Sequence, residues 1–355
     1  MAGIGIKDVA ARAGVSVATV SRVLNAHTSV SPAARERVLA AVEALGYRPN
    51  ALARSLRTDQ TRTLGLIISD VLNPYFTALA RSVEEEARAL GYSIVFGNAD
   101  ERPELQDHHI RTLLDRRIDG LLVSPADGGS PLVLDAARAG TPMVFVDRWI
   151  PGADVPVVRS DGRAAVRDLV AHLHGLGHRR LAIIAGPAAT TTGSERVAAF
   201  REALAAYGIA LPDAYIGQGD FQAASGRRAT ERFLALPEPP EVVFAADNLM
   251  ALGALDAIRA RGLRVPHDIA LAAFDDIPWF VHTDPPLTAI AQPTEELGRA
   301  AVRALTDLIE GRTPESVTLP ARLVVRNSCG ERTTTAATRA TLETRATRAT
   351  RRSDA

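Results

Sequence analysis

The chain has 355 residues, and its 41 basic side chains balance its 41 acidic ones, so its formal net charge is zero. Its single cysteine, Cys329, excludes an internal disulfide and a cysteine-based zinc site. No secretory leader and no apolar run of transmembrane length is recognisable in the sequence. We therefore expect a cytoplasmic protein with no membrane partner.

The first 58 residues differ from the rest of the chain in charge. They hold eight arginines and lysines against three acidic residues. A local excess of positive charge is typical of a surface that faces phosphate groups. The chain beyond this segment is long enough for one or two further α/β units, each with a sizeable core.

Residues 6–25 predict two short helices joined by a tight turn. The apolar residues of the first helix follow the i, i+3, i+4, i+7 spacing of one helical face. They are Ile6, Val9, Ala10 and Ala13. Gly14 gives the turn its backbone freedom, and Ser16 is expected to cap the second helix.

The second helix points three apolar residues inward and leaves a small face of two apolar and two polar residues outside. Its inward residues are Val20, Val23 and Leu24, and its outward residues are Val17, Ala18, Ser21 and Arg22. Such a face has the shape and chemistry to enter a DNA major groove. A compact three-helix bundle without a DNA role is the alternative interpretation of these residues.

A third helix is expected to begin at Ser31 and Pro32 and to end at Gly46. It is followed by YRPNALARSLRT at residues 47–58. The helix pair, the third helix and this segment together resemble the lactose and galactose repressor family of bacterial transcription regulators. The resemblance implies a DNA-binding head over residues 1–49 and a hinge helix with its linker over residues 50–62.

The resemblance also implies which residues contact DNA. They are Ser16, Val17, Ala18, Thr19, Ser21, Arg22, Asn25, Asn50, Ala53, Leu56 and Arg57. Val17, Ala18 and Arg22 would contact bases, since a guanidinium can donate to guanine and an apolar side chain can meet a thymine methyl group. Leu56 lies where members of the family insert a wedge into the minor groove.

From Thr63 onward, short apolar runs alternate with helical stretches, which predicts parallel sheets with helices on both faces. The expected strands are 63–69, 92–97, 120–124, 142–147, 181–186, 241–247 and 269–275. Several of these runs end in aspartate, asparagine or serine. Because parallel sheets bind ligands at the carboxyl ends of their strands, these residues are candidates for a site, although each could simply cap a helix.

In this region the sequence resembles the two-lobed periplasmic sugar-binding fold that follows the DNA head in the family. The resemblance covers residues 63–330. Lobe one would comprise 63–161 with 293–324, and lobe two 162–292 with 325–330. The ligand would lie in the cleft between the lobes.

The family's effector contacts fall on ten positions of this chain. They are Asn73, Tyr75, Phe76, Asp147, Arg148, Thr192, Arg196, Phe221, Asp247 and Asp275. Thr192 and Arg196 belong to a segment, TTTGSER, that we expect to be a loop. Carboxylates and guanidinium groups suit vicinal hydroxyls, and aromatic faces suit the apolar side of a sugar ring. Since purine-responsive members tend to carry an aromatic residue after the aspartate at position 147, Arg148 favours a sugar over a purine or nucleoside.

Enzyme functions are not supported by the motifs. Lys7 is the only lysine, so no Walker loop is possible, and neither a G-x-S-x-G elbow nor a G-x-G-x-x-G loop follows a strand. His172, His174 and His178 resemble metal ligands, but Gly175 and Gly177 interrupt the helix that would align them. We expect no cofactor, no metal and no catalysis.

The last 25 residues, 331–355, are rich in arginine, threonine and alanine, and we expect them to be disordered. They carry no leucine heptad that would make a tetramer, so we expect a homodimer that binds a near-palindromic operator. A sugar-binding protein that feeds a transporter is the rival class, but it would need an export signal and no DNA head.

Overall fold

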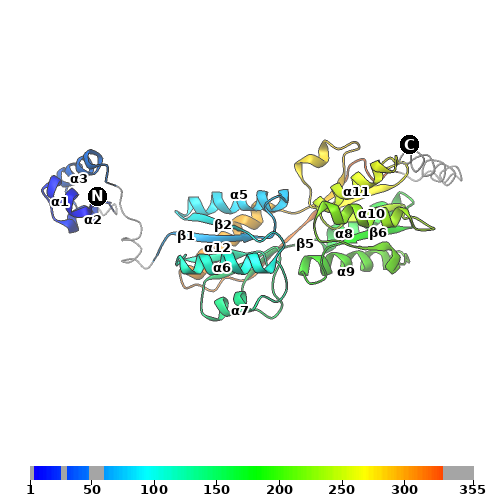
Figure 1. The fold of residues 1–355 in the computed structure, drawn as a ribbon, viewed down its shortest axis with the longest axis horizontal. Helices are drawn as coiled ribbons and strands as arrows, with labels where there is room; N and C mark the ends of the chain where they lie inside the picture. The colour runs from blue at the N-terminus through cyan, green and yellow to red at the C-terminus, as the bar shows by residue number, and fades with distance from the viewer. Residues whose placement is uncertain (1–3, 25–29, 48–59, 331–355) are drawn as a thin grey trace. The chain divides into compact units, whose positions relative to one another are not determined.

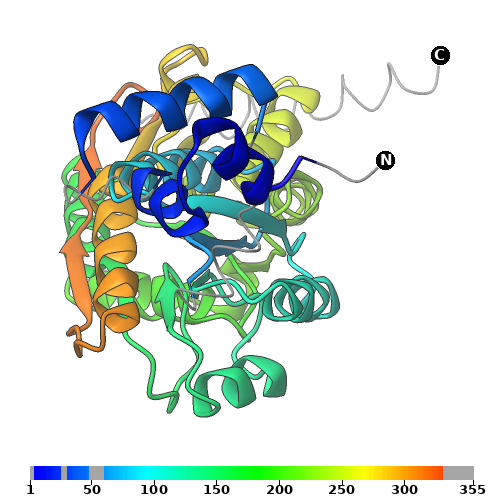
Figure 2. The same cartoon turned by 90° about the vertical axis from the view of Figure 1, so that its left-hand side faces the viewer.

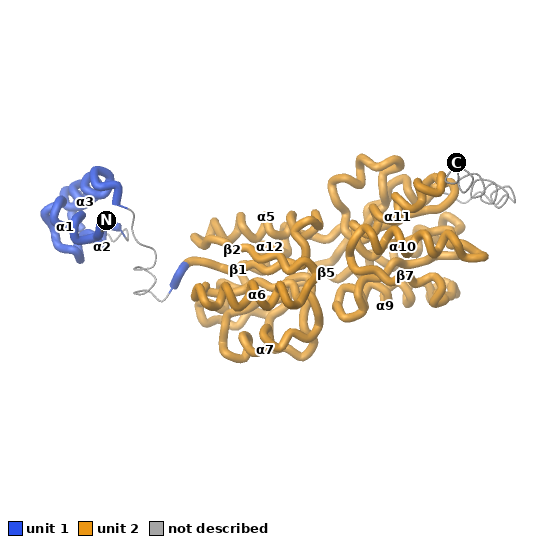
Figure 3. The backbone as a smooth tube through the Cα atoms, viewed as in Figure 1, with its two compact units in different colours: residues 1–61 blue, residues 62–355 orange. Residues whose placement is uncertain are grey.

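The computed structural model describes residues 4–24, 30–47 and 60–330. The chain divides into two compact units, Met1–Thr61 and Arg62–Ala355 (Figure 3). Each unit is built around its own apolar core. Residues 50–59 of the expected hinge and linker, and the tail at 331–355, lie outside the described residues.

The first unit contains three helices, α1 (Ile6–Ala13), α2 (Val17–Leu24) and α3 (Pro32–Leu45). Their core is formed around Val9, Val20 and Val38, all of them buried. Gly14 adopts a left-handed backbone with φ 63°, which confirms the turn between α1 and α2. At the start of α3, the Ala34 amide donates to Ser31 Oγ at 3.4 Å, and Gly46 ends this helix.

The second unit contains two six-stranded sheets, each covered by helices (Figure 1). The first sheet has the order β11-β5-β4-β3-β1-β2. Its strands are β1 (Thr63–Ile68), β2 (Ser93–Asn98), β3 (Gly120–Val123), β4 (Met143–Val146), β5 (Val157–Asp161) and β11 (Val317–Pro320). All of its strand pairs are parallel.

Two helices lie on each face of this sheet. One face carries α5 (Pro74–Ala89) and α12 (Thr294–Ile309), which pack on Leu64, Leu66 and Ile68. The opposite face carries α6 (Pro103–Asp115) and α7 (Pro131–Arg138), so α12 and α6 lie on opposite sides of the strands (Figure 2). The continuous apolar runs seen in the sequence follow from this burial of both faces.

The second sheet has the order β12-β10-β9-β8-β6-β7. Its strands are β6 (Leu181–Ala185), β7 (Ile216–Gln218), β8 (Val242–Ala245), β9 (Ala270–Phe274), β10 (Thr288–Ala291) and β12 (Arg322–Val324). The helices that cover it are α8 (Arg163–Gly175), α9 (Thr191–Ala205), α10 (Ala223–Leu234) and α11 (Asn248–Ala260). Short 3-10 turns, η1 (Asp213–Tyr215) and η2 (Pro278–Val281), lie in its connections.

The chain crosses between the two sheets three times, after β5, after β10 and after β11. The third crossing corrects the predicted lobe limits. β12 pairs antiparallel with β10 in the second sheet, whereas the sequence analysis assigns 322–324 to the first lobe. The change of sheet occurs at Ala321, whose amide donates to the Asp161 carbonyl at 2.9 Å.

Candidate functional site

The three residues predicted to contact bases lie on the exposed face of α2. Val17, Ala18 and Arg22 are exposed, and Val17 is 40% exposed despite being apolar. Ser16 caps the helix as predicted, since the Thr19 amide donates to Ser16 Oγ at 3.1 Å. Thr19 and Ser21 are half-buried, and the Thr19 hydroxyl lies 2.9 Å from Ser16 Oγ.

The remaining predicted DNA contacts lie outside the described residues. They are Asn25, Asn50, Ala53, Leu56 and Arg57. Their expected roles rest on the sequence alone.

In the second unit, three predicted effector contacts have an unusual backbone. Asp147 follows β4, Asp275 follows β9 and Phe221 precedes α10, and their φ angles are 68°, 66° and 63°. Left-handed backbone is uncommon for residues other than glycine and gathers at functional sites. Gly186 makes room for one of them, because a Cβ there would lie 2.3 Å from the Phe221 ring.

The first-lobe part of the site begins at the start of α5. Asn73 caps this helix, since its Oδ1 accepts from the Tyr75 amide at 3.0 Å. The Tyr75 hydroxyl donates to Asp147 Oδ1 at 3.0 Å. Burial, with Asp147 adding to it, raises the pKa of Tyr75 well above its usual value, so the phenol stays protonated and keeps donating.

Arg148 is held as a buried cation. Its guanidinium donates to both carboxylate oxygens of Glu101, at 2.6 and 2.8 Å. It also lies over the rings of Phe221 and Phe76, 4.6 and 5.8 Å from their centroids. The sequence analysis missed Glu101, although it follows β2 at the same sheet edge as the predicted aspartates.

A second arginine and carboxylate lie in the other lobe. Arg196 donates to the Ala246 carbonyl at 2.7 Å, lies 3.7 Å from the centroid of the Phe274 ring and is 3.8 Å from Asp275 Oδ2. Gln292, which the sequence analysis also missed, donates to Asp275 Oδ1 at 2.5 Å. Burial raises the pKa of Asp275, and Arg196 opposes this shift.

Hydrogen bonds join the two lobes at the base of α11. Asn73 Nδ2 donates to Asp247 Oδ2 at 3.1 Å, and Asn248 donates to Asn73 Oδ1 at 2.8 Å. Asp247 also caps α11, because its Oδ1 accepts from the Met250 amide at 3.0 Å. Burial, assisted by the charge of Asp275, raises the pKa of Asp247 to about 7.

All ten predicted effector contacts are buried, with exposed fractions between 2% and 9%. The hydrogen bonds of Asn73 join residues of the two lobes, whereas Thr192 Oγ1 has no hydrogen-bond partner in the described structure. The sequence analysis was wrong about one local structure: α9 begins at Thr191, so Thr192 and Arg196 lie on a helix and not on a loop. Thr190 caps this helix, since its Oγ1 accepts from the Gly193 amide at 3.1 Å.

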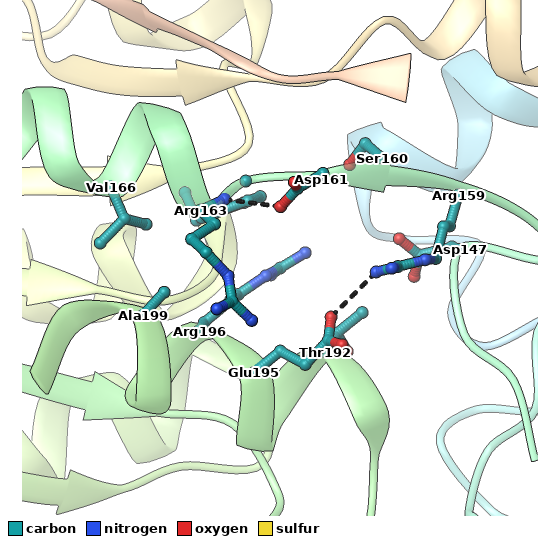
Figure 4. A pocket seen from close by; sticks show the side chains of 12 residues that line it. Asp147, Arg159, Ser160, Asp161, Arg163, Val166, Thr192, Glu195, Arg196 and Ala199 are labelled. Atoms are coloured by element: carbon teal, nitrogen blue, oxygen red, sulfur yellow. Dashed lines mark hydrogen bonds and ion pairs between the residues drawn. The ribbon is translucent and has the colours of Figure 1, made fainter. Parts of the chain in front are cut away.

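A pocket of about 230 Å³ opens between β5, the start of α8 and α9 (Figure 4). Asp147, Thr192 and Arg196 of the predicted set line it. Its other lining residues are Arg159, Ser160, Asp161, Gly162, Arg163, Val166, Glu195, Ala199 and Phe274. Three buried polar atoms at the cleft have no hydrogen-bond partner in the described structure, namely Arg148 Nε, Thr192 Oγ1 and Asn248 Oδ1.

Two of the three histidines considered as metal ligands, His174 and His178, make local contacts instead. His178 Nε2 donates to the carbonyls of Cys329 and Gly330, at 2.8 and 3.1 Å, and His174 stacks on Tyr207. Burial lowers the pKa of His172. Within the described ranges, no group of three or more potential ligands could hold a metal ion. In the same ranges, no helix has the length and apolarity to cross a membrane.

Two family models match the chain. One, described as bacterial regulatory proteins of the lacI family, matches residues 5–50, and a periplasmic binding protein-like domain matches residues 170–329. The HTH-type transcriptional repressor CytR of Escherichia coli (strain K12) is 36% identical over 329 residues, covering 91% of this chain and 95% of that protein. The repressor PurR of Escherichia coli O139:H28 is 37% identical over 335 residues, covering 92% and 97%.

Solved structures agree with these matches. A Lac repressor dimer bound to operator and the anti-inducer ONPF has a TM-score of 0.84 and 31% identity, covering 93% of this chain and 100% of that one. A complex of the transcriptional regulator CelR with cellobiose has a TM-score of 0.70 and 35% identity, covering 92% and 99%.

Proposed function

Because the chain belongs to the lacI family of bacterial regulatory proteins, we propose that it represses sugar-utilisation genes under the control of a small neutral sugar or sugar derivative. It is a DNA-binding transcriptional regulator with a ligand-binding core. The sugar would bind in the cleft between the two lobes and change the affinity for operator DNA.

The chemistry of the cleft is the observation that supports a sugar as the effector. Each lobe contributes a guanidinium with a carboxylate nearby, Arg148 with Asp147 and Arg196 with Asp275. Such pairs can both donate to and accept from vicinal hydroxyls. Phe76 and Phe221 add apolar faces of the kind that cover a sugar ring. The CelR complex with cellobiose shows that a similar protein holds a sugar.

We assign effector binding to the ten cleft residues and add Gln292, which orients Asp275. We favour a sugar over a purine or nucleoside, because purine-responsive members of the family tend to carry an aromatic residue where this chain has Arg148. The arrangement calls for no catalytic role.

On DNA, we propose a homodimer whose two α2 helices enter successive major grooves of a near-palindromic operator, as the Lac repressor dimer on its operator suggests. Val17, Ala18 and Arg22 would be the base-contacting residues. We keep residues 1–49 as the DNA-binding head, 50–62 as the hinge and 63–330 as the effector-binding core.

A ligand panel tests the choice of effector. Purified protein is heated with neutral mono- and disaccharides, nucleobases and nucleosides, and each hit is measured by calorimetry. A ligand that prefers the native state raises the unfolding midpoint, so at least one sugar should do so. Stabilisation by a nucleobase or nucleoside with no response to any sugar would overturn the proposal.

A further inference from the structure

The pocket extends well beyond the residues that the family resemblance implies. Its inner end is formed by buried Asp147, Thr192 and Arg196, whereas most of its lining comes from β5, α8 and α9. We call Arg159, Asp161, Arg163 and Glu195 the outer rim. Arg159 and Glu195 are half-buried, and Asp161 and Arg163 are exposed, so the pocket runs outward to solvent (Figure 4).

Both ends of the pocket offer hydrogen bonds. At the inner end, Thr192 Oγ1 is buried without a partner in the described structure, and the residue is only 8% exposed. Buried hydroxyl groups are rarely left unpaired, so this atom indicates a polar ligand group. At the rim, Arg159 Nη1 lies 3.2 Å from Glu195 Oε2. Burial raises the pKa of the Glu195 carboxyl group.

The charges of the lining balance. Its residues include three with guanidinium groups, Arg159, Arg163 and Arg196, and three with carboxylates, Asp147, Asp161 and Glu195. At the rim, the carboxylates of Asp161 and Glu195 would repel a phosphate, and the guanidinium groups of Arg159 and Arg163 would repel an ammonium group. A neutral group that both donates and accepts avoids either repulsion.

From this lining we infer that the outer rim is a second sugar subsite and that the preferred effector is a neutral disaccharide or longer saccharide, not a single ring. The inference rests on the proposed sugar effector. One ring would lie among the predicted contacts, and the next would lie between β5 and the α9 face formed by Thr192, Glu195 and Ala199. Among the described residues that line the pocket, Phe274 is the aromatic one, and the Arg196 guanidinium already lies 3.7 Å from its ring centroid, so the pocket suits hydroxyl groups better than a nucleobase.

Matched pairs of sugars test the inference by calorimetry. Glucose is compared with cellobiose and maltose, galactose with lactose, and xylose with xylobiose. For the sugar that binds, we expect the disaccharide to bind about tenfold tighter than its own monosaccharide, since a few added hydrogen bonds to charged groups supply that factor.

Substitutions at the rim should act on this preference. Glu195→Gln and Asp161→Asn keep the side-chain size and should each lower the ratio of disaccharide to monosaccharide affinity by about threefold or more. Ala199→Leu should narrow the pocket and remove the preference. Glu231→Gln, on the exposed face of α10, is the matched control and should leave the ratio unchanged.

Three outcomes are distinguishable. Equal or tighter binding of the monosaccharide overturns the second subsite and leaves a sugar effector standing. If the rim variants lower the affinities for monosaccharide and disaccharide equally, these side chains do not form the second subsite. Binding of a nucleoside and of no sugar overturns the proposed effector together with this inference.

Discussion

At the scale of single residues, Asp247 connects the two lobes through an ionisable group. Its carboxylate caps α11 and accepts from Asn73 while almost completely buried. Because burial raises its pKa from 3.8 to about 7, the folded protein holds a proton there that the unfolded chain releases near pH 4. This group therefore lowers the free energy of unfolding as the pH rises.

We therefore expect the free energy of unfolding to depend on pH through Asp247. A raised carboxyl pKa destabilises the fold progressively between about pH 4 and pH 7 and by a constant amount above, up to about 4 kcal/mol for a shift of this size. Asp247→Asn keeps a capping oxygen but cannot titrate. Urea unfolding from pH 4 to 8 should show the parent losing stability relative to the variant, and a pH-independent difference would contradict the raised pKa.

At the scale of elements, α10 and α11 approach each other unusually closely. A Cβ at Gly253 would lie 1.8 Å from the Ala223 carbonyl oxygen, and one at Gly226 would lie 2.2 Å from the Met250 carbonyl oxygen. Both glycines are in helices, where glycine is otherwise unfavourable. The close approach of the two backbones explains why glycine occupies both positions.

Alanine substitutions test this packing. Gly253→Ala should destabilise the protein by at least about 1 to 3 kcal/mol, because the backbones must separate. Gly175→Ala in α8 is the matched control: a Cβ there meets nothing within 4 Å, so the change should be neutral or stabilise by less than about 1 kcal/mol. Denaturant unfolding of both variants measures the difference, and similar midpoints would show that α10 and α11 can move apart at little cost.

The helices and strands also show how much of the fold could be predicted from the sequence. All seven predicted strands form, because buried apolar runs such as 181–186 are fixed by local composition. Five strands were missed, namely β5, β7, β10, β11 and β12, and each has only three to five residues. Three of them, β7, β11 and β12, also lie at sheet edges. The segment TTTGSER was expected to be a loop because its threonines and Gly193 are weak helix formers, but Thr190 caps a helix that begins at Thr191.

The candidate site was predictable in part. Residues at strand ends, such as Asp147 and Asp275, follow from the parallel topology. Glu101 and Gln292 do not, because each is defined by a partner distant in the chain, at Arg148 and Asp275 respectively. The rim of the pocket was missed for the same reason: β5 and α9 meet only in the folded chain.

At the scale of the whole ligand-binding unit, two separate sheets are joined by three crossings and by side-chain contacts across the cleft. Besides the bonds of Asn73, Gln222 Nε2 donates to Asp70 Oδ2 at 3.0 Å. A ligand can shift the balance between open and closed lobes only through its differential affinity for the two states. Contacts that both lobes make to the sugar would supply that difference.

The Asp275→Ala variant tests this coupling. It should bind operator DNA without ligand as the parent does, because the substitution lies outside the unit Met1–Thr61. Sugar affinity should fall by about one to two powers of ten, since charge-assisted hydrogen bonds are lost. Fluorescence anisotropy with labelled operator and calorimetry with the sugar measure both, and undiminished sugar binding would remove Asp275 from the site.

The left-handed backbone at Phe221 sets a limit on how stable this protein can be. Aspartate tolerates such a conformation fairly well, but for a bulky aromatic residue it costs about 1 to 3 kcal/mol. The buried ring more than offsets this cost, because truncating a buried phenylalanine costs about 3 to 5 kcal/mol. Directed evolution toward heat resistance should therefore retain Phe221, and with it a proposed sugar contact, even when the sugar response is not selected.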